Sequence, residues 1–188
     1  FTLSVRPFLE KMAPYKLHTA YVHLIDIGES AAETRIRDMI DVQVNPTIAP
    51  YAAEGECMFR VTQRMDSDTD PDLLGPVLDE LKNRFGDHIY EIGTRSMKEV
   101  VFEKLLAQKM TVAFAESCTA GMISADFGDI PGVSQVFTGS CISYTNRIKE
   151  NVLGVPSDIL TKFGAVSEEC AAAMAEGVRK LMRTDIGV

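Results

Sequence analysis

The feature that most constrains the fold is a pair of short apolar runs, each followed by small polar residues and then by a helix-like pattern. The first run, Val112 to Ala115, leads into Ser117, and the second, Val136 to Tyr144, leads into a segment that contains Lys149. Apolar runs of this length are typical of buried strands, and their alternation with helical segments indicates an α/β layered domain. We therefore expect Ser117 and Lys149 at strand-to-helix junctions, with side chains directed into a cleft.

A hydroxyl at one junction and an amine at the other are the components of a Ser–Lys hydrolytic dyad. The residues leave other interpretations open, because Ser117 or Thr119 is also a normal helix N-cap and Lys149 is also a normal solvated lysine. Tyr144 ends the second strand, where its hydroxyl can assist proton transfer or its ring can stack. It is also consistent with an ordinary rim aromatic.

The turn after the first strand has further candidate groups. Backbone N–H groups around residues 118–121 can stabilise an oxyanion or hold a phosphate, and Gly121 allows a close approach of the backbone to a ligand. Cys118 is an alternative nucleophile, but adjacent side chains at a strand end face opposite ways, and we favour Ser117. A Ser–His–Asp triad would need a histidine from outside this segment, since the histidines stand at 18, 23 and 88.

Composition excludes several classes of function. The net charge of −8 disfavours a phosphate-backbone binder, and no apolar run approaches the roughly 20 residues that cross a bilayer. The four cysteines, at 57, 118, 141 and 170, have no metal-ligand spacing and indicate reduced thiols in a cytoplasmic protein. The chain starts at Phe1 without a signal-peptide pattern, so we expect part of a longer protein.

The first half predicts a small α+β domain with the element order β-α-β-β-α-β, preceded by a linker helix at 2–11. Ser30 and Glu33 predict a capping box, and Glu54-Gly55 a hairpin turn. The predicted strands are 21–27, 47–51, 57–64 and 88–92, and the predicted helices are 30–41 and 71–85. The domain spans residues 1–93, with its boundary at Gly93-Thr94.

The second half, residues 94–188, predicts the α/β layered domain. Ser96 with Glu99 forms a second capping box, Asn146 is a plausible N-cap, and Ser167 caps an alanine-rich helix. The predicted helices are 96–109, 119–127, 146–153, 157–163 and 168–182, and the predicted strands are 112–115 and 136–144. Asp185 to Val188 reads as the start of a strand, so we expect this domain to be incomplete.

Several ordered motifs resemble those of the CinA family of competence- and damage-inducible proteins. The most specific is A-E-S-C-T-A-G at 115–121, which is similar to the family's A-E-S-C-T-G-G signature. Two motifs of the first half, at 27–33 and 45–52, are similar to the family's KH-like domain. Further matching motifs are D-I-P-G at 129–132, Y-T-N-R-I-K at 144–149, L-G-V-P at 153–156 and G-A-V-S-E-E at 164–169.

The resemblance implies a nicotinamide mononucleotide deamidase domain that converts the carboxamide to the acid and ammonia in pyridine-nucleotide salvage. The family's nucleophile corresponds to Ser117 and its lysine to Lys149, with Tyr144 beside them, and neither a metal nor a cofactor is required. The implied partners are the nucleotide substrate and a second copy of the chain, without nucleic acid or membrane. The implied substrate-binding positions are Cys118, Thr119, Ala120, Gly121, Gly139 and Asn146.

Two departures from the family pattern leave an alternative open. Ala120 replaces the first glycine of the motif, which is harmless if its φ is helical, and the chain stops before the family's glycine-rich loop. The alternative is a nucleotide-binding or regulatory module without complete catalytic machinery. Nucleic-acid binding by the KH-like half is disfavoured, because residues 1–95 contain no G-x-x-G loop and the chain is acidic.

Overall fold

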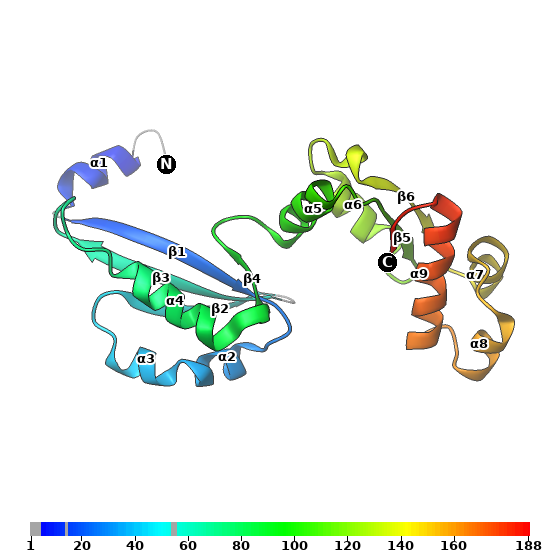
Figure 1. The fold of residues 1–188 in the computed structure, drawn as a ribbon, viewed down its shortest axis with the longest axis horizontal. Coiled ribbons are helices and arrows are strands. Elements are labelled where there is room, and N and C mark those ends of the chain that lie inside the picture. The colour runs from blue at the N-terminus through cyan, green and yellow to red at the C-terminus, as the bar shows by residue number, and fades with distance from the viewer. Residues whose placement is uncertain (1–4, 14, 54–55) are drawn as a thin grey trace. The chain divides into compact units, whose positions relative to one another are not determined.

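The computed structural model describes residues 5–13, 15–53 and 56–188. The chain divides into two compact units, Phe1–Arg95 and Ser96–Val188, each with its own sheet and buried core (Figure 1). The first sheet is antiparallel and the second is parallel, which confirms the predicted fold class of an α+β domain followed by an α/β layered domain. Within the described residues, none of the helices has the length and apolarity needed to cross a membrane.

The first unit is a four-stranded sheet in the order β2-β3-β1-β4 with helices against it. In chain order its elements are α1 (Val5–Met12), β1 (Lys16–Leu24), α2 (Glu29–Arg35), α3 (Arg37–Val42), β2 (Thr47–Ala53), β3 (Glu56–Met65), α4 (Leu74–Phe85), the 3₁₀ turn η1 (Gly86–His88) and β4 (Ile89–Ile92). Alternate residues of β3 are buried, and the ring of Phe59 meets that of Phe85 in α4 edge-on, with centroids 5.3 Å apart. Helices α2, α3 and α4 lie on the same side of this sheet (Figure 1).

Three expectations for the first unit need correction. The helix predicted at 30–41 is two helices, because Ile36 leaves helical backbone (φ −121°, ψ 16°) and its side chain is fully buried in the core. Tertiary burial here overrides local helix propensity. The predicted capping box at Ser30 is absent, since Gly28 is the N-cap and Glu33 pairs with Arg37 instead.

The first strand is also longer than the apolar pattern indicates. β1 begins at Lys16 rather than at Tyr21, because it pairs with β3 without a break from Lys16, opposite Met65, to Leu24. Hydrogen bonding to a neighbouring strand extends an element beyond its apolar stretch. The hairpin turn predicted at Glu54-Gly55 lies outside the described residues.

The second unit is a three-stranded parallel sheet in the order β6-β5-β7. In chain order its elements are α5 (Met97–Gln108), β5 (Val112–Glu116), α6 (Met122–Gly128), the 3₁₀ turn η2 (Val133–Gln135), β6 (Phe137–Ile142), α7 (Asn146–Leu153), α8 (Ser157–Lys162), α9 (Glu168–Met182) and β7 (Ile186–Gly187). Val112 and Phe114 pack with residues of α5 and α6, whereas Ala113 packs with residues of α7, α8 and α9. Helices therefore cover both faces of the sheet, as parallel sheets require.

The helix caps of this unit agree only in part with the predictions. The capping box of Ser96 and Glu99 is present, and the side chain of Ser167 accepts the N–H of Cys170 at 3.1 Å. Asn146 is the first helical residue rather than the cap, which is Thr145. The strand predicted at 136–144 is the shorter β6.

Helix α7, which carries Lys149, is held close to helix α9. A Cβ atom at Gly177 in α9 would collide with the backbone carbonyl oxygen of Leu153 at the end of α7. Only glycine permits this approach, so Gly177 sets the spacing of the two helices. The position of Lys149 thus depends on packing as well as on its own strand-to-helix connection.

Candidate active site

The turn that joins β5 to α6 has two consecutive residues with positive φ, Ala120 at 50° and Gly121 at 101°. They delay the helix predicted at 119–127 until Met122. Ala120 therefore does not have the helical φ that would make its substitution for glycine harmless. Left-handed backbone costs a residue with a Cβ about 1 kcal/mol, so the turn is held by interactions elsewhere.

The structure brings Ser117 and Lys149 together across the ends of β5 and β6. The Nζ atom of Lys149 donates to the Oγ atom of Ser117 at 2.8 Å, and it also donates to the backbone carbonyl of Ser143. Lys149 is 1 % exposed, whereas Ser117 is half-buried. In the described parts of the chain no carboxylate lies within ion-pair distance of Lys149, so its contacts are to neutral oxygens.

The two strand ends are joined by the main chain. The N–H of Ser143 donates to the carbonyl of Glu116 at 2.7 Å, one step beyond the register pair of Glu116 with Ile142. Ser117 follows directly after Glu116, and Lys149 donates to Ser143, so both dyad residues are positioned from one ladder of the parallel sheet. Parallel strands end at the same edge, which is why polar residues that follow two neighbouring strands meet.

Glu116 is a site residue to which sequence reasoning assigned no role. Its side chain is 2 % exposed, and its carboxylate accepts the N–H groups of Gly121 at 3.0 Å, Ile123 at 3.2 Å and Ser124 at 2.9 Å, with the Ser124 hydroxyl as a further donor. The available signal was a lone acid at the end of an apolar run, directly before a turn rich in unpaired N–H groups.

These bonds also determine the charge of Glu116. Burial by itself raises the pKa of the carboxyl, but hydrogen bonds from the hydroxyls of Ser124 and Thr119 and from the N–H groups of Ser124 and Ile123 outweigh burial. They lower the pKa to about 2. Glu116 is therefore an anion at neutral pH, held by donors that belong to the start of α6.

The N–H groups predicted to hold an oxyanion are only partly available. Those of Ala120 and Gly121 donate within the protein, to the carbonyl of Ser117 at 3.1 Å and to Glu116. Those of Cys118 and Thr119 have no acceptor among the residues that the structure describes. Two N–H groups beside Ser117 thus remain able to bind an external oxygen.

The other predicted site residues differ in exposure and in their place in the fold. Tyr144 is 67 % exposed and lies two residues beyond the end of β6, and Asn146 and Cys118 are also exposed. Gly139 lies in the interior of β6, opposite Ala113, where a Cβ atom would contact the side chain of Met182 in α9. The structure therefore brings Gly139 under a helix rather than to the strand end.

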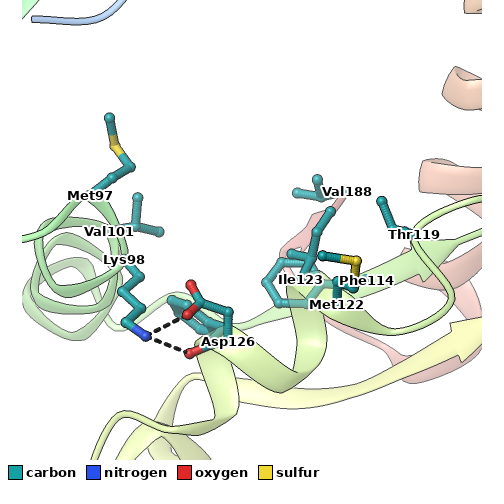
Figure 2. A pocket seen from close by; sticks show the side chains of 10 residues that line it. Met97, Lys98, Val101, Phe114, Thr119, Met122, Ile123, Asp126 and Val188 are labelled. Atoms are coloured by element: carbon teal, nitrogen blue, oxygen red, sulfur yellow. Dashed lines mark hydrogen bonds and ion pairs between the residues drawn. The ribbon is translucent and has the colours of Figure 1, made fainter. Parts of the chain in front are cut away.

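An apolar cavity of about 570 Å³ lies on the α5–α6 side of the sheet (Figure 2). Phe114, Met122, Ile123 and Val188 line it, and the ion pair of Lys98 with Asp126, at 2.6 Å, also borders it. Of the predicted site residues only Thr119 reaches this cavity, which includes neither Ser117 nor Lys149. Among the described residues no cluster of three or more His, Cys, Asp or Glu side chains is placed to hold a metal ion.

Relatives with known names resemble the chain over its whole length. It is 44 % identical to a CinA-like protein of Dictyoglomus thermophilum and 43 % identical to a putative competence-damage inducible protein of Clostridium beijerinckii, each over 100 % of this chain and 46 % of the relative. The chain thus spans about half the length of the curated relatives that it matches. Among solved structures, the competence/damage inducible protein CihA of Agrobacterium tumefaciens is 35 % identical, with a TM-score of 0.44 over 47 % of this chain and 53 % of that one.

Two family models together match most of the sequence. The CinA C-terminal domain matches residues 94–188, and the KH domain of damage-inducible protein CinA matches residues 19–90. These matches correspond to the parallel-sheet unit with Ser117 and Lys149 and to the antiparallel-sheet unit before it. The chain therefore belongs to the CinA family.

Proposed function

We propose that the chain is a nicotinamide-nucleotide amidase that hydrolyses the carboxamide of nicotinamide mononucleotide to the acid and ammonia. The observation that carries the proposal is the 2.8 Å contact between the Nζ atom of Lys149 and the Oγ atom of Ser117. A nucleophile within hydrogen-bond reach of a buried base is the geometry that acyl transfer requires. The family resemblance supplies the substrate.

In the proposed reaction, Lys149 takes the proton of Ser117 while Oγ attacks the carboxamide carbon. The negative charge that develops on the carboxamide oxygen is stabilised by the two N–H groups of Cys118 and Thr119. Lys149 then gives its proton to the departing nitrogen, and ammonia leaves an ester on Ser117. A water molecule, deprotonated by Lys149, hydrolyses this ester and releases the acid.

Two further residues have roles in this proposal. The carbonyl of Ser143 orients the amine of Lys149, because it accepts one N–H and thereby directs the Nζ atom toward Ser117. Tyr144 stacks on the pyridine ring or assists proton transfer. Tyr144→Phe separates the two roles, since it keeps the ring and removes the hydroxyl, and only a hydroxyl role predicts lost activity.

The cellular setting is also a proposal. The net charge of −8 disfavours nucleic acid as a partner, and the four free cysteines fit a reducing cytoplasm. A homodimer rests on the family resemblance alone and is tested by analytical ultracentrifugation. A single sedimenting species at the monomer mass would exclude it.

The first test is ammonia release from nicotinamide mononucleotide by this chain and by one extended to the length of its relatives. We expect Ser117→Ala and Lys149→Met to lower kcat at least about 10³-fold while circular dichroism stays unchanged. Matched controls are Ser134→Ala and Lys104→Met, which change the same residue types at exposed positions. Full activity in either dyad variant would refute the mechanism.

The left-handed backbone of Ala120 favours a second candidate function, a nucleotide-binding or regulatory module that does not turn over. Ala120, three residues after Ser117, carries a Cβ atom on left-handed backbone where the family motif has a glycine, and such a Cβ atom can displace the turn from its catalytic geometry. Calorimetry with nicotinamide mononucleotide distinguishes the two. Saturable binding without ammonia in the extended chain supports the module, and turnover excludes it.

A further inference from the structure

The geometry points to Glu116 as the positioning residue that holds both members of the Ser117–Lys149 pair in place. Its side chain fixes the turn that carries Ser117, and its main chain fixes the strand end that orients Lys149. This inference rests on the proposed function for its catalytic consequence, but the positioning itself is a property of the fold.

The side chain acts on the turn between β5 and α6. One carboxylate oxygen accepts the N–H groups of Gly121 and Ile123, and the other accepts the N–H and the hydroxyl of Ser124. These bonds tie the start of α6 back to the end of β5, so residues 117–120 form a closed loop between fixed ends. They also supply the constraint that keeps Ala120 at a φ of 50°.

The main chain acts on the second strand. The carbonyl of Glu116 accepts the N–H of Ser143 at 2.7 Å, and the carbonyl of Ser143 in turn accepts the amine of Lys149. A shift of Glu116 therefore moves the Oγ atom of Ser117 and the Nζ atom of Lys149 together. Apart from Lys149 itself, which donates to Ser117 and to Ser143, Glu116 is the residue whose hydrogen bonds reach both the turn and the second strand end among the residues that the structure describes.

The chemistry of the site requires a carboxylate. Every group that faces the side chain of Glu116 is a donor, and a carboxylate is the side-chain group that only accepts. Glutamine would turn an NH₂ group toward N–H donors, and aspartate is one methylene too short. Because the pKa of Glu116 is lowered to about 2 and its oxygens are filled by donors, it is not a competing base for Ser117.

The test compares Glu116→Gln with Glu150→Gln, which makes the same change at an exposed position of α7. We expect Glu116→Gln to lower kcat about 30-fold or more while KM changes less than threefold. A merely structural role predicts equal losses throughout the unit, so the second readout is residue-resolved amide hydrogen exchange. We expect the amides of Gly121, Ile123 and Ser124 to exchange at least about tenfold faster, with those of α9 unchanged.

Each outcome decides the inference. Loss of kcat with faster exchange confined to the turn supports it, and unchanged exchange at these three amides overturns it. If the wild-type chain and its extended form release no ammonia, the proposed function fails, and the exchange measurement alone still decides the positioning role.

If Glu116→Gln does not fold, Ser124→Ala removes one donor, and we expect faster exchange at Ile123 and Ser124. Wild-type exchange rates in that variant would refute the inference.

Discussion

Each unit of the molecule has a buried polar side chain that bonds to the connection before a helix, Gln63 before α4 and Glu116 before α6, but the two side chains differ in charge. In the first unit Gln63, 1 % exposed, donates to the carbonyl of Pro71 at 2.7 Å and accepts the N–H of Leu73 at 2.9 Å, just before α4. In the second unit Glu116 accepts only N–H and hydroxyl donors at the start of α6. Both are fully satisfied, as buried polar groups must be.

The difference shows what decides whether a buried connection needs a charge. One donor and one acceptor face Gln63, and a neutral amide matches both of them. Only donors face Glu116, and an anion matches them better because charge-assisted hydrogen bonds are stronger than neutral ones. The charged connection is also the one that carries the candidate nucleophile.

The largest expected effect comes from replacing the neutral amide of Gln63, before α4, with a carboxylate. Gln63→Glu places a carboxylate against the carbonyl of Pro71, and we expect a loss of about 4 kcal/mol in unfolding free energy at pH 8. A protonated carboxyl can replace the amide, so burial raises its pKa and the loss disappears below about pH 4. Hydrogen exchange of the β3 amides measures the change, with Gln108→Glu at an exposed position as the control.

A pH-independent loss in Gln63→Glu would show that packing, rather than the pairing of donors and acceptors, sets the requirement at this connection. The explanation of the difference between Gln63 and Glu116 by their donors and acceptors would then be wrong for Gln63.

The second prediction concerns Glu116, whose stabilising contribution is lost at low pH, whereas the loss in Gln63→Glu disappears there. The pKa of Glu116 is lowered from 4.5 to about 2, so its contribution is fully present above about pH 4.5 and is lost as pH falls toward 2. The shift corresponds to about 3 kcal/mol. We expect the difference in unfolding free energy between wild type and Glu116→Gln to shrink over this window.

Measuring a difference is necessary because the pKa values of other carboxyls, among them Asp38, Asp70 and Asp185, are lowered too. These groups titrate equally in the wild type and in Glu116→Gln, and their contribution cancels. A difference that stays constant from pH 5 to pH 2 would contradict the assignment of the low pKa to Glu116.

The smallest expected effect concerns the turn itself. Ala120→Gly removes a Cβ atom from a residue with a φ of 50°, and we expect unfolding free energy to rise by about 0.5–1 kcal/mol. Ala125→Gly in α6, where backbone is helical, is the matched control and should lower stability by a similar amount. Urea unfolding, monitored by hydrogen exchange of the α6 amides, measures the unfolding free energy of both variants. A loss of stability in Ala120→Gly would show that the turn is not strained.

The sequence predicted the architecture because apolar patterns and turn residues, the two kinds of evidence used, depend on neighbouring residues in the chain. Alternating apolar patterns and turn residues identified an α+β domain and an α/β domain, and the structure confirms that class. The sequence also indicated that Ser117 and Lys149 would meet, since each follows one of two strands. The break of a predicted helix at Ile36 and the extension of β1 to Lys16 were not predictable, because burial and strand pairing between distant residues decide them.

The sequence by itself determined which chemical groups are present at the site: a hydroxyl, an amine and a turn with unpaired N–H groups. Only the tertiary structure decided that Glu116 turns inward, that it occupies the N–H of Gly121, and that Gly139 lies beneath α9. The physical reason is that the direction of a side chain at a strand end depends on the donors that surround it. Those donors assemble only when β5, β6 and the first turn of α6 have packed together.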